Sequence, residues 1–188
     1  MNNQKKEVDS ILISRAKKGD MEAFESLIRK YQKSIYYLCY RMTMAHQSAD
    51  DIAQEVFIRA YFSIKKFKEG MNFYTWVRKI AVNLSLNYLK KKKREVLFSN
   101  NDRTIEKNIS SESQEMPLDC LQREEMKEKF EEAVNSLPSD QKAVFLLKVQ
   151  ENQSYEEISR VLKIPKGTIM SRLNRARNKL KIIMADYL

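Results

Sequence analysis

Apolar side chains recur every three or four residues along most of this chain, which is the spacing that places them on one face of an α-helix. The clearest such stripe comprises Phe24, Leu27, Ile28, Tyr31, Ile35 and Leu38. No segment combines the strict alternation of a β-strand with the dipeptides that close hairpins. The pattern therefore predicts an all-α protein.

Helix breakers and capping residues divide the first half of the chain into four helices. The first is expected over about residues 8–18, and Asp20 is a suitable cap for the second. Residues 48–51 resemble a capping box that would open the third helix. The fourth helix is expected to run from Phe73 to Arg94.

A change in composition separates this half from the next. Residues 99–115 are rich in Ser, Asn and Glu and hold few large apolar groups, so they bury too little surface to offset chain entropy. From Ser99 to Glu132 ten acids oppose five bases, a local charge of −5. We therefore expect two small helical domains joined by a flexible acidic linker over residues 97–118.

The second domain is expected to contain about four helices, the last two forming a helix-turn-helix. Pro138 is placed to start one helix, and Ser154 and Glu157 have capping-box spacing at the start of the next. A tight turn over residues 163–168 then leads into a helix from about Lys166 toward Ala185. Such a pair of helices places its second member in the DNA major groove.

The last helix divides into an apolar and a polar face. The face predicted to be buried carries Ile169, Leu173, Ala176 and Leu180. Residues 166–181 hold six bases and no acid. The polar face offers groups that donate to base edges and phosphates, namely Thr168, Ser171, Asn174, Arg175 and Asn178. A basic surface helix that closes a bundle is the alternative, and a lone helix-turn-helix indicates DNA binding and no more.

The overall charge also favours a polyanionic partner. The formal net charge is +10 and the pI is about 9.5, while 43% hydrophobic residues support a real core. No apolar run approaches the roughly 18 residues of a membrane span, and the amino terminus lacks a signal peptide's apolar stretch, so a cytoplasmic protein is expected. Cys39 and Cys120 have no metal-type spacing and are expected to be small buried or semi-buried residues.

The predicted helix over residues 73–94 combines aromatic groups with seven bases, and no acid follows Arg78 in it. Aromatic rings stack on unpaired bases while Lys and Arg hold the backbone of single-stranded DNA. Trp76, however, is spaced with Ile80 and Leu84 as a core residue would be, so a structural role stays open.

A compact acidic segment, residues 50–57, stands out in this basic protein. Asp51 and Glu55 share one helical face, yet the chain has a single histidine, His46, no Gly-rich phosphate loop and no second carboxylate cluster with the spacing of metal ligands. We therefore expect no catalytic residue, no metal and no cofactor. The segment is interpreted as an anionic surface for a basic protein partner, and His46 as a surface or capping residue.

The acidic segment, the aromatic–basic helix and the helix-turn-helix, in this order along the chain, resemble the extracytoplasmic-function (group IV) sigma factors of bacterial RNA polymerase. The resemblance covers nearly the whole chain. It implies a region 2 domain over residues 1–96, a linker over 97–118 in place of the family's middle domain, and a region 4 helix-turn-helix domain over 119–188. The implied polymerase-binding residues are Asp50, Asp51, Gln54, Glu55 and Phe57.

The resemblance also implies which residues contact the promoter. The loop over residues 66–73 corresponds to one that captures a flipped-out base. The implied minus-ten contacts are Lys66, Phe73, Trp76, Arg78, Lys79, Asn83, Asn87, Lys90 and Lys91. The implied minus-thirty-five contacts are Lys166, Gly167, Thr168, Met170, Ser171, Arg172, Asn174 and Arg175. Met170 stands where many relatives carry arginine, which leaves the minus-thirty-five sequence open.

The resemblance thus implies a promoter-specific initiation factor that acts in stress responses and is not an enzyme. Its implied partners are core RNA polymerase, promoter DNA in duplex and single-stranded form, and a cognate anti-sigma factor. A stand-alone helix-turn-helix regulator is the main alternative, but it would leave the acidic segment and the aromatic–basic helix without a task. A nuclease is a further alternative, for which the sequence offers no metal or nucleophile constellation.

Overall fold

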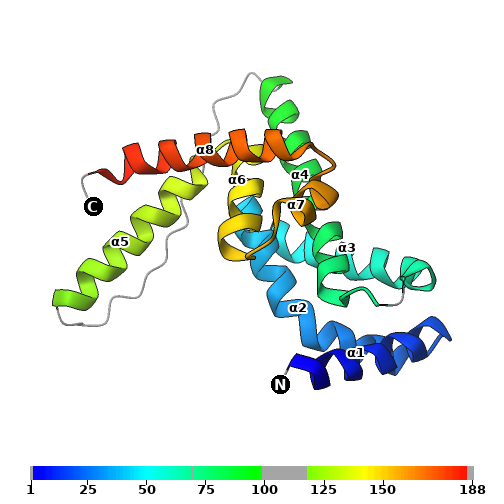
Figure 1. Cartoon of the computed structure of the whole chain (residues 1–188). Coiled ribbons are helices and arrows are strands. Elements are labelled where there is room, and N and C mark those ends of the chain that lie inside the picture. The colour runs from blue at the N-terminus through cyan, green and yellow to red at the C-terminus, as the bar shows by residue number, and fades with distance from the viewer. Residues whose placement is uncertain (1, 69, 99–117, 186–188) are drawn as a thin grey trace. The chain divides into compact units, whose positions relative to one another are not determined.

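The computed structural model describes residues 2–68, 70–98 and 118–185. Within these ranges every regular element is a helix, which confirms the predicted all-α class (Figure 1). The chain divides into two compact units, the first built mainly from Met1–Leu89 and the second mainly from later residues. Most of the expected linker, residues 99–117, lies outside the described residues.

The first unit contains α1 (Asn2–Lys17), α2 (Met21–Thr43), α3 (His46–Ser63), the short 3₁₀ helix η1 (Ile64–Lys66) and, up to Leu89, α4 (Phe73–Phe98). α2 packs against both α1 and α3, and α1 also contacts η1. The most deeply buried side chains include Leu27, Ile35, Leu38, Val56, Phe73 and Val77. Burying one such side chain contributes roughly 1.5–3 kcal/mol, so this apolar core holds the helices of the unit together.

The turn between α1 and α2 depends on Gly19 and Asp20. Gly19 has φ +97°, a left-handed conformation that residues with a Cβ rarely adopt. Asp20 caps α2 as predicted, because its Oδ1 accepts a hydrogen bond from the Ala23 amide at 3.0 Å. Its Oδ2 accepts a second bond from Arg15 Nε at 2.7 Å. These two bonds hold the pKa of the Asp20 carboxyl below its usual value.

The start of α3 differs from the prediction, and the capping box expected at residues 48–51 is wrong. The helix begins at His46, with Ala45 at the cap position and no side-chain hydrogen bond there. Ser48 already lies in the first turn, and its Oγ donates to the Tyr88 hydroxyl of α4 at 2.7 Å. The hydroxyl that resembles a cap in the sequence is therefore a tertiary contact between two helices.

The second unit contains the end of α4 from Lys90, α5 (Leu118–Asn135), α6 (Ser139–Phe145), a π-helical turn η2 (Leu146–Gln150), α7 (Tyr155–Leu162) up to Ser159, and α8 (Lys166–Ile183). α8 packs against α5 and α6. Its buried residues are Ile169, Leu173, Ala176 and Leu180, which confirms the predicted apolar face. α6 begins directly after Pro138, also as predicted.

Cys39 and Lys142 are ionisable side chains buried in the first and the second core, respectively. Cys39 is fully buried, as expected, and burial raises the pKa of its thiol to about 11, which keeps it unreactive. The side chain of Cys120 lies outside the described residues. Lys142 of α6 is 4% exposed, and its Nζ donates to Asn135 Oδ1 at 2.9 Å. Burial lowers the pKa of Lys142 to about 8.

Candidate nucleic-acid and protein interfaces

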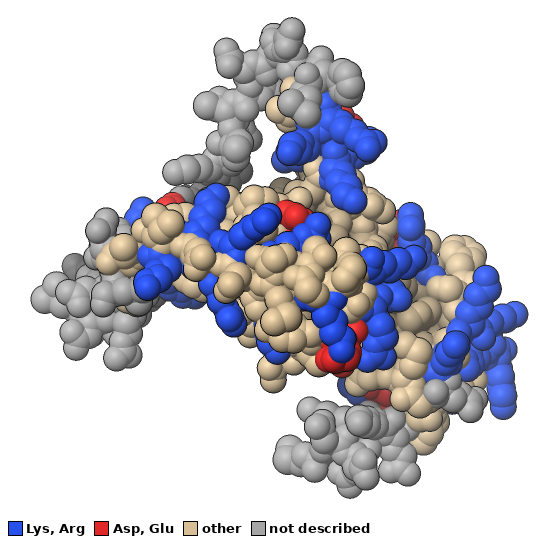
Figure 2. Space-filling model, turned by 45° about the horizontal axis from the view of Figure 1, so that its top comes forward, with Lys and Arg blue, Asp and Glu red and all other residues tan. Residues whose placement is uncertain are grey.

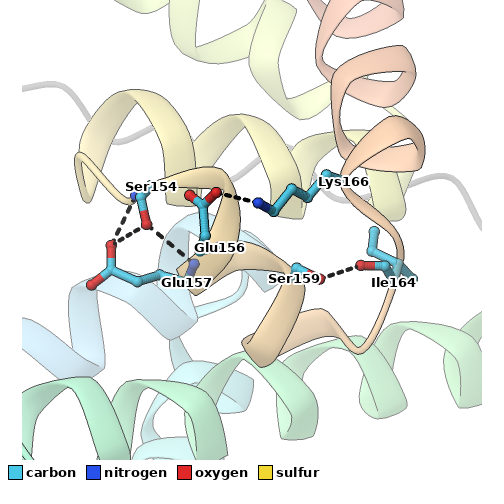
Figure 3. A network of polar contacts seen from close by, with 6 residues as sticks. All are labelled: Ser154, Glu156, Glu157, Ser159, Ile164 and Lys166. Carbon is cyan, nitrogen blue, oxygen red and sulfur yellow. Dashed lines mark hydrogen bonds and ion pairs between the residues drawn. The ribbon is translucent and has the colours of Figure 1, made fainter.

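The helix-turn-helix of α7 and α8 begins with a complete capping box (Figure 3). The Ser154 amide donates to Glu157 Oε2 at 2.8 Å, and the Glu157 amide donates to Ser154 Oγ at 3.2 Å. Two amides that the helix itself cannot satisfy are thereby paired. This confirms the start of α7 that the sequence predicts.

The turn between α7 and α8 is held by contacts on both sides (Figure 3). Lys163 has φ +55°, and a left-handed residue at this point ends α7 and turns the chain. Ser159 Oγ donates to the Ile164 carbonyl at 2.7 Å, and an ion pair joins Lys166 of α8 to Glu156 of α7. These contacts fix the orientation of the start of α8 relative to α7.

The exposed face of α8 carries most of the predicted minus-thirty-five residues. Those exposed to solvent are Lys166, Gly167, Met170, Ser171, Asn174 and Arg175. Thr168 and Arg172 are half-buried, and Arg172 Nε lies 3.1 Å from Asp140 Oδ2 of α6. On the face drawn in Figure 2, Lys and Arg side chains cover far more surface than Asp and Glu. The exposed polar and basic side chains of α8 are suited to hydrogen bonds with base edges and phosphates.

In the first unit, α4 begins in a cluster of aromatic rings. The centroid of Trp76 lies 5.2 Å from that of Phe67 and 5.8 Å from that of Phe73. Phe67 and Phe73 are buried, whereas Trp76 is half-buried. The structural role left open for Trp76 is therefore present, while part of its side chain stays at the surface beside residues 66–73.

Two of the predicted minus-ten residues lie beneath the surface. Phe73 is 1% exposed and Arg78 is 2% exposed, and the Arg78 guanidinium lies 5.3 Å from the ring centroid of Tyr74. A cation–π contact of this kind stabilises the aromatic cluster. Both residues thus support the candidate site from within. The predicted residues that are exposed are Lys66, Asn83, Asn87, Lys90 and Lys91, while Lys79 is half-buried.

Sequence reasoning missed the contacts that hold this cluster in place. Tyr31 of α2 lies against the cluster, with its ring centroid 5.6 Å from that of Phe73 and 5.8 Å from that of Tyr74. The Tyr31 hydroxyl donates to Asp9 of α1, which also accepts a bond from Lys30 Nζ at 2.5 Å. The apolar periodicity marks Tyr31 as a core residue, but nothing local in the sequence pairs its hydroxyl with Asp9.

The cap of α4 was also missed, although a signal for it exists. Asn72 Oδ1 accepts a hydrogen bond from the Thr75 amide at 3.0 Å, which is the usual action of an asparagine just before a helix. Gly70, with φ +80°, precedes it in the loop. Asparagine directly before the aromatic run of α4 is the signal that could have identified this cap.

A groove of about 780 Å³ lies between α2 and α3. Its apolar lining includes Phe24, Ile28, Phe57, Ile58 and Phe62. Phe62 is 81% exposed, and a large apolar side chain in that position is typical of a protein-binding surface. The groove therefore offers a partner an apolar surface bordered by polar groups.

The groove brings together three of the five predicted polymerase-binding residues. Asp50, Gln54 and Phe57 line it. Asp51 is exposed on α3 but is not part of the lining, and Glu55 Oε1 accepts a hydrogen bond from Arg59 Nε at 2.6 Å. The structure thus places the apolar residues of the groove beside part of the acidic segment.

Two tyrosines of α2 complete the groove and were not found from the sequence. Tyr36 and Tyr37 line it, and Tyr36 Oη lies 2.6 Å from Nδ1 of His46. Burial, followed by the nearby charge of Asp50, raises the pKa of Tyr36. His46 is exposed, as expected, and stacks on Tyr40 with 4.3 Å between ring centroids. Adjacent tyrosines fall on both sides of the apolar stripe, so periodicity alone does not assign them to a groove.

Two further properties concern only the described part of the chain. There, no three His, Cys, Asp or Glu side chains are grouped so that they could hold a metal ion. None of the helices in this part combines the length and the apolar character that crossing a membrane requires.

Known proteins share both the sequence and the fold. Residues 27–95 match the family model of Sigma-70 region 2, and residues 127–180 match that of Sigma-70, region 4. The chain is 34% identical to the ECF RNA polymerase sigma factor SigW of Bacillus subtilis (strain 168), over 93% of its own length and 95% of that protein. It is 33% identical to the ECF RNA polymerase sigma-E factor of Escherichia coli (strain K12), over 92% of each chain.

A solved structure supports the same relationship. The sigma factor RpoE of Bartonella quintana, determined in complex with the anti-sigma factor NepR, superimposes with a TM-score of 0.69. The two chains are 25% identical, and the match covers 88% of this chain and 98% of RpoE.

Matches to both region 2 and region 4 define the class of the protein, an RNA polymerase sigma factor that binds promoter DNA. Within that class, the chain belongs to the extracytoplasmic-function (ECF) sigma factors. This confirms the family that the sequence motifs indicate. A stand-alone regulator that never contacts polymerase is not favoured by these relationships.

Proposed function

We propose that this sigma factor directs promoter-specific initiation through three surfaces on one chain. The α2–α3 groove binds core RNA polymerase, α4 with residues 66–73 captures the minus-ten strand, and the exposed face of α8 binds the minus-thirty-five duplex. The region 2 domain would span residues 1–96, the linker 97–118 and the region 4 domain 119–188. One observation carries the proposal: an apolar groove suited to protein and an acid-free helical face suited to DNA lie on separate units of one chain.

The chemistry of the groove supports polymerase docking. Its apolar lining and the exposed Phe62 provide a surface that gains free energy when a partner covers it. Asp50 and Gln54 add polar groups at the lining, and the exposed Asp51 adds negative charge nearby. Such charges steer a basic surface into register and repel DNA. We propose that Phe57 contributes to docking as part of the groove lining, and that Glu55 contributes from the face of α3 beside the groove.

The exposed residues of α4 support capture of the minus-ten strand. Asn83 and Asn87 present amide groups that can both donate to and accept from a base edge, while Lys90 and Lys91 suit phosphate contacts. The unpaired state is stabilised by these contacts, and unstacking costs only a few kcal/mol per base. We therefore propose that the protein opens promoters without hydrolysing a nucleotide and is not an enzyme.

The exposed face of α8 supports recognition of the minus-thirty-five duplex. Asn174 and Arg175 can form hydrogen bonds with base edges, and Lys166 can bind a phosphate. Met170, 56% exposed, offers an apolar thioether where an arginine would form hydrogen bonds. We therefore propose an apolar contact, such as one with a thymine methyl group, at the position that Met170 reaches.

Regulation by a protein partner follows from the family. RpoE of Bartonella quintana was solved in complex with the anti-sigma factor NepR. By analogy we propose that a cognate anti-sigma factor holds this sigma factor inactive in the cytoplasm until a stress signal releases it.

Run-off transcription with purified core polymerase on a library of random promoters tests the proposed function. Specific transcripts are expected without any added ATPase, because binding energy alone opens the promoter. The enriched templates would also reveal the two elements that α4 and α8 recognise. A strict requirement for an ATPase, or absence of transcripts from correctly folded protein, would contradict the proposal.

A further inference from the structure

A group of lysines lies where the end of α1 meets η1. Lys17 and Lys18 end α1 and begin the turn after it, and Lys65, Lys66 and Lys68 belong to η1 and the residues that follow. α1 and η1 are in contact, so segments distant in sequence bring these five lysines into one neighbourhood, here called the α1–η1 lysine patch. Only Lys66 is among the proposed minus-ten residues.

The patch keeps its positive charge at the surface. Lys18, Lys65, Lys66 and Lys68 are exposed, and Lys17 is half-buried. Among the described residues none of the five forms an ion pair, whereas Arg15 beside them is paired with Asp20 at 2.7 Å. Glu69 lies outside the described residues, and in the sequence residues 65–69 hold three lysines and one acid, so this segment has a net positive charge.

The patch is continuous with the aromatic cluster at the start of α4. Phe67 stands between Lys66 and Lys68 in the chain, and its ring centroid lies 5.2 Å from that of Trp76. From the α1 side, Lys17 Nζ lies 5.9 Å from the centroid of the same Phe67 ring. Lys17 and Lys18 precede the part of the chain that matches Sigma-70 region 2, residues 27–95.

We propose that the α1–η1 lysine patch binds the phosphates of the promoter single strand that flank the base captured by residues 66–73. This rests on the proposed minus-ten function of that loop. A cationic surface beside aromatic rings is the arrangement that follows a single-stranded backbone, with phosphates on the lysines and a base near the rings. α1 thereby extends the minus-ten site beyond α4.

The test uses the complete complex of core polymerase with this protein and a promoter selected in the transcription experiment. Probes carry a pre-opened minus-ten region whose single strand is cut back, in steps, from either side of the captured base. For Lys17→Gln/Lys18→Gln, weaker binding to the full probe is expected, with a plot of log K against log salt shallower by about 0.7 for each lysine. Once the strand is cut back from the patch, variant and wild type should bind equally.

Two control variants separate the patch from general electrostatics. Lys127→Gln/Lys129→Gln removes the same charge from α5 and should show no dependence on strand length. Lys17→Arg/Lys18→Arg keeps the charge and should bind the full probe like wild type. An equal loss for Lys17→Gln/Lys18→Gln on every probe, or no loss on any, would overturn the proposal.

The same measurements distinguish this proposal from the function on which it rests. If the wild type forms the complex and opens the promoter, but the binding loss of Lys17→Gln/Lys18→Gln does not depend on strand length, only the patch proposal fails. If the wild type neither assembles with polymerase nor opens a promoter, the proposed function fails and the patch proposal fails with it.

Discussion

Lys142 carries a charge inside the second unit, and its environment makes stability depend on pH. Its pKa is about 8 in the folded unit and near 10.5 in the unfolded chain. Below pH 8 both states hold the proton, so the folded state bears the full cost of a buried charge. Between pH 8 and 10.5 the unfolded state binds more protons than the folded state, so stability rises with pH through this window.

Replacing Lys142 with methionine should therefore stabilise the second unit. At pH 7 we expect Lys142→Met to raise the free energy of unfolding by about 1–3 kcal/mol, because the apolar stem is kept and the buried charge is removed. The half-exposed Asn135 can exchange its lysine bond for water. Urea unfolding at pH 7 and pH 10 measures the effect, and the gap to wild type should narrow at pH 10.

The exposed Lys127 of α5 provides the matched control for that measurement. Lys127→Met should change stability by less than about 0.5 kcal/mol at either pH, since no charge is buried there. If Lys142→Met were destabilised at pH 7, the bond from Lys142 to Asn135 would outweigh the cost of burying the charge.

Asn174 and Arg177 test how α8 divides base recognition from phosphate binding. Both are exposed, but Asn174 lies on the face proposed to meet base edges. Asn174→Ala should weaken binding to the selected minus-thirty-five duplex by about 1–3 kcal/mol and flatten the preference at one base pair. Arg177→Ala should weaken binding to all duplexes alike and reduce the salt slope by about 1. Competition binding on single-base variants of the duplex measures both, and identical profiles for the two variants would contradict this division.

Among the elements, α1 supports the aromatic cluster through a hydrogen bond that its Asp9 accepts from Tyr31. Asp9 is 7% exposed and accepts the Tyr31 hydroxyl, whose pKa is raised by burial and by this carboxylate. Tyr31→Phe keeps the ring against Phe73 and removes only the bond to α1. We expect it to lower the free energy of unfolding of the first unit by about 1–2 kcal/mol in urea unfolding.

The control for Tyr31→Phe is the same change at Tyr37. Tyr37 is 56% exposed at the groove, so Tyr37→Phe should leave stability within about 0.5 kcal/mol of wild type. Tyr31→Ala should cost clearly more than Tyr31→Phe, because it also removes the ring from the cluster. Equal stability of Tyr31→Phe and wild type would show that the contact with Asp9 contributes nothing net.

Helix ends that are capped by residues close in the sequence could be predicted from the sequence. Asp20 and the Ser154–Glu157 box act within a few residues of themselves, and both caps are present. Ser48 has a similar local pattern, but its hydroxyl pairs with Tyr88, a residue far along the chain. A rule based on neighbouring residues cannot identify Tyr88 as a competing partner for the hydroxyl, so the predicted cap is wrong.

The candidate surfaces could be predicted only where side chains stay exposed. The exposed face of α8 could be predicted from helical periodicity, because the buried residues of this helix all fall on the opposite face. Arg78 has the right charge for DNA, yet the ring of Tyr74 and the packing of α4 bury it. The groove is formed by the packing of α2 on α3, which no single-helix pattern describes.

For the whole molecule, the structure predicts that polymerase binding depends most on the apolar part of the groove. Phe62→Ala should weaken binding to core polymerase by more than about tenfold, because a central aromatic side chain commonly supplies 2 kcal/mol or more at an interface. Its 81% exposure means that folding stability should not change. Ile182→Ala, which truncates a side chain 76% exposed on α8, is the matched control and should leave polymerase affinity unchanged.

The two units should contribute independently to the promoter complex. Phe62 belongs to the groove of the first unit, and Asn174 belongs to α8 of the second, the helix proposed to bind the minus-thirty-five duplex. Substitutions that share no partner add their effects within about 0.5 kcal/mol, so the double variant Phe62→Ala/Asn174→Ala should lose the sum of the two single losses in promoter occupancy. The double-mutant cycle is measured with polymerase limiting, by occupancy of the selected promoter. A coupling well above that margin would mean that docking on polymerase changes how α8 meets the duplex, and the three surfaces would then act as one linked system.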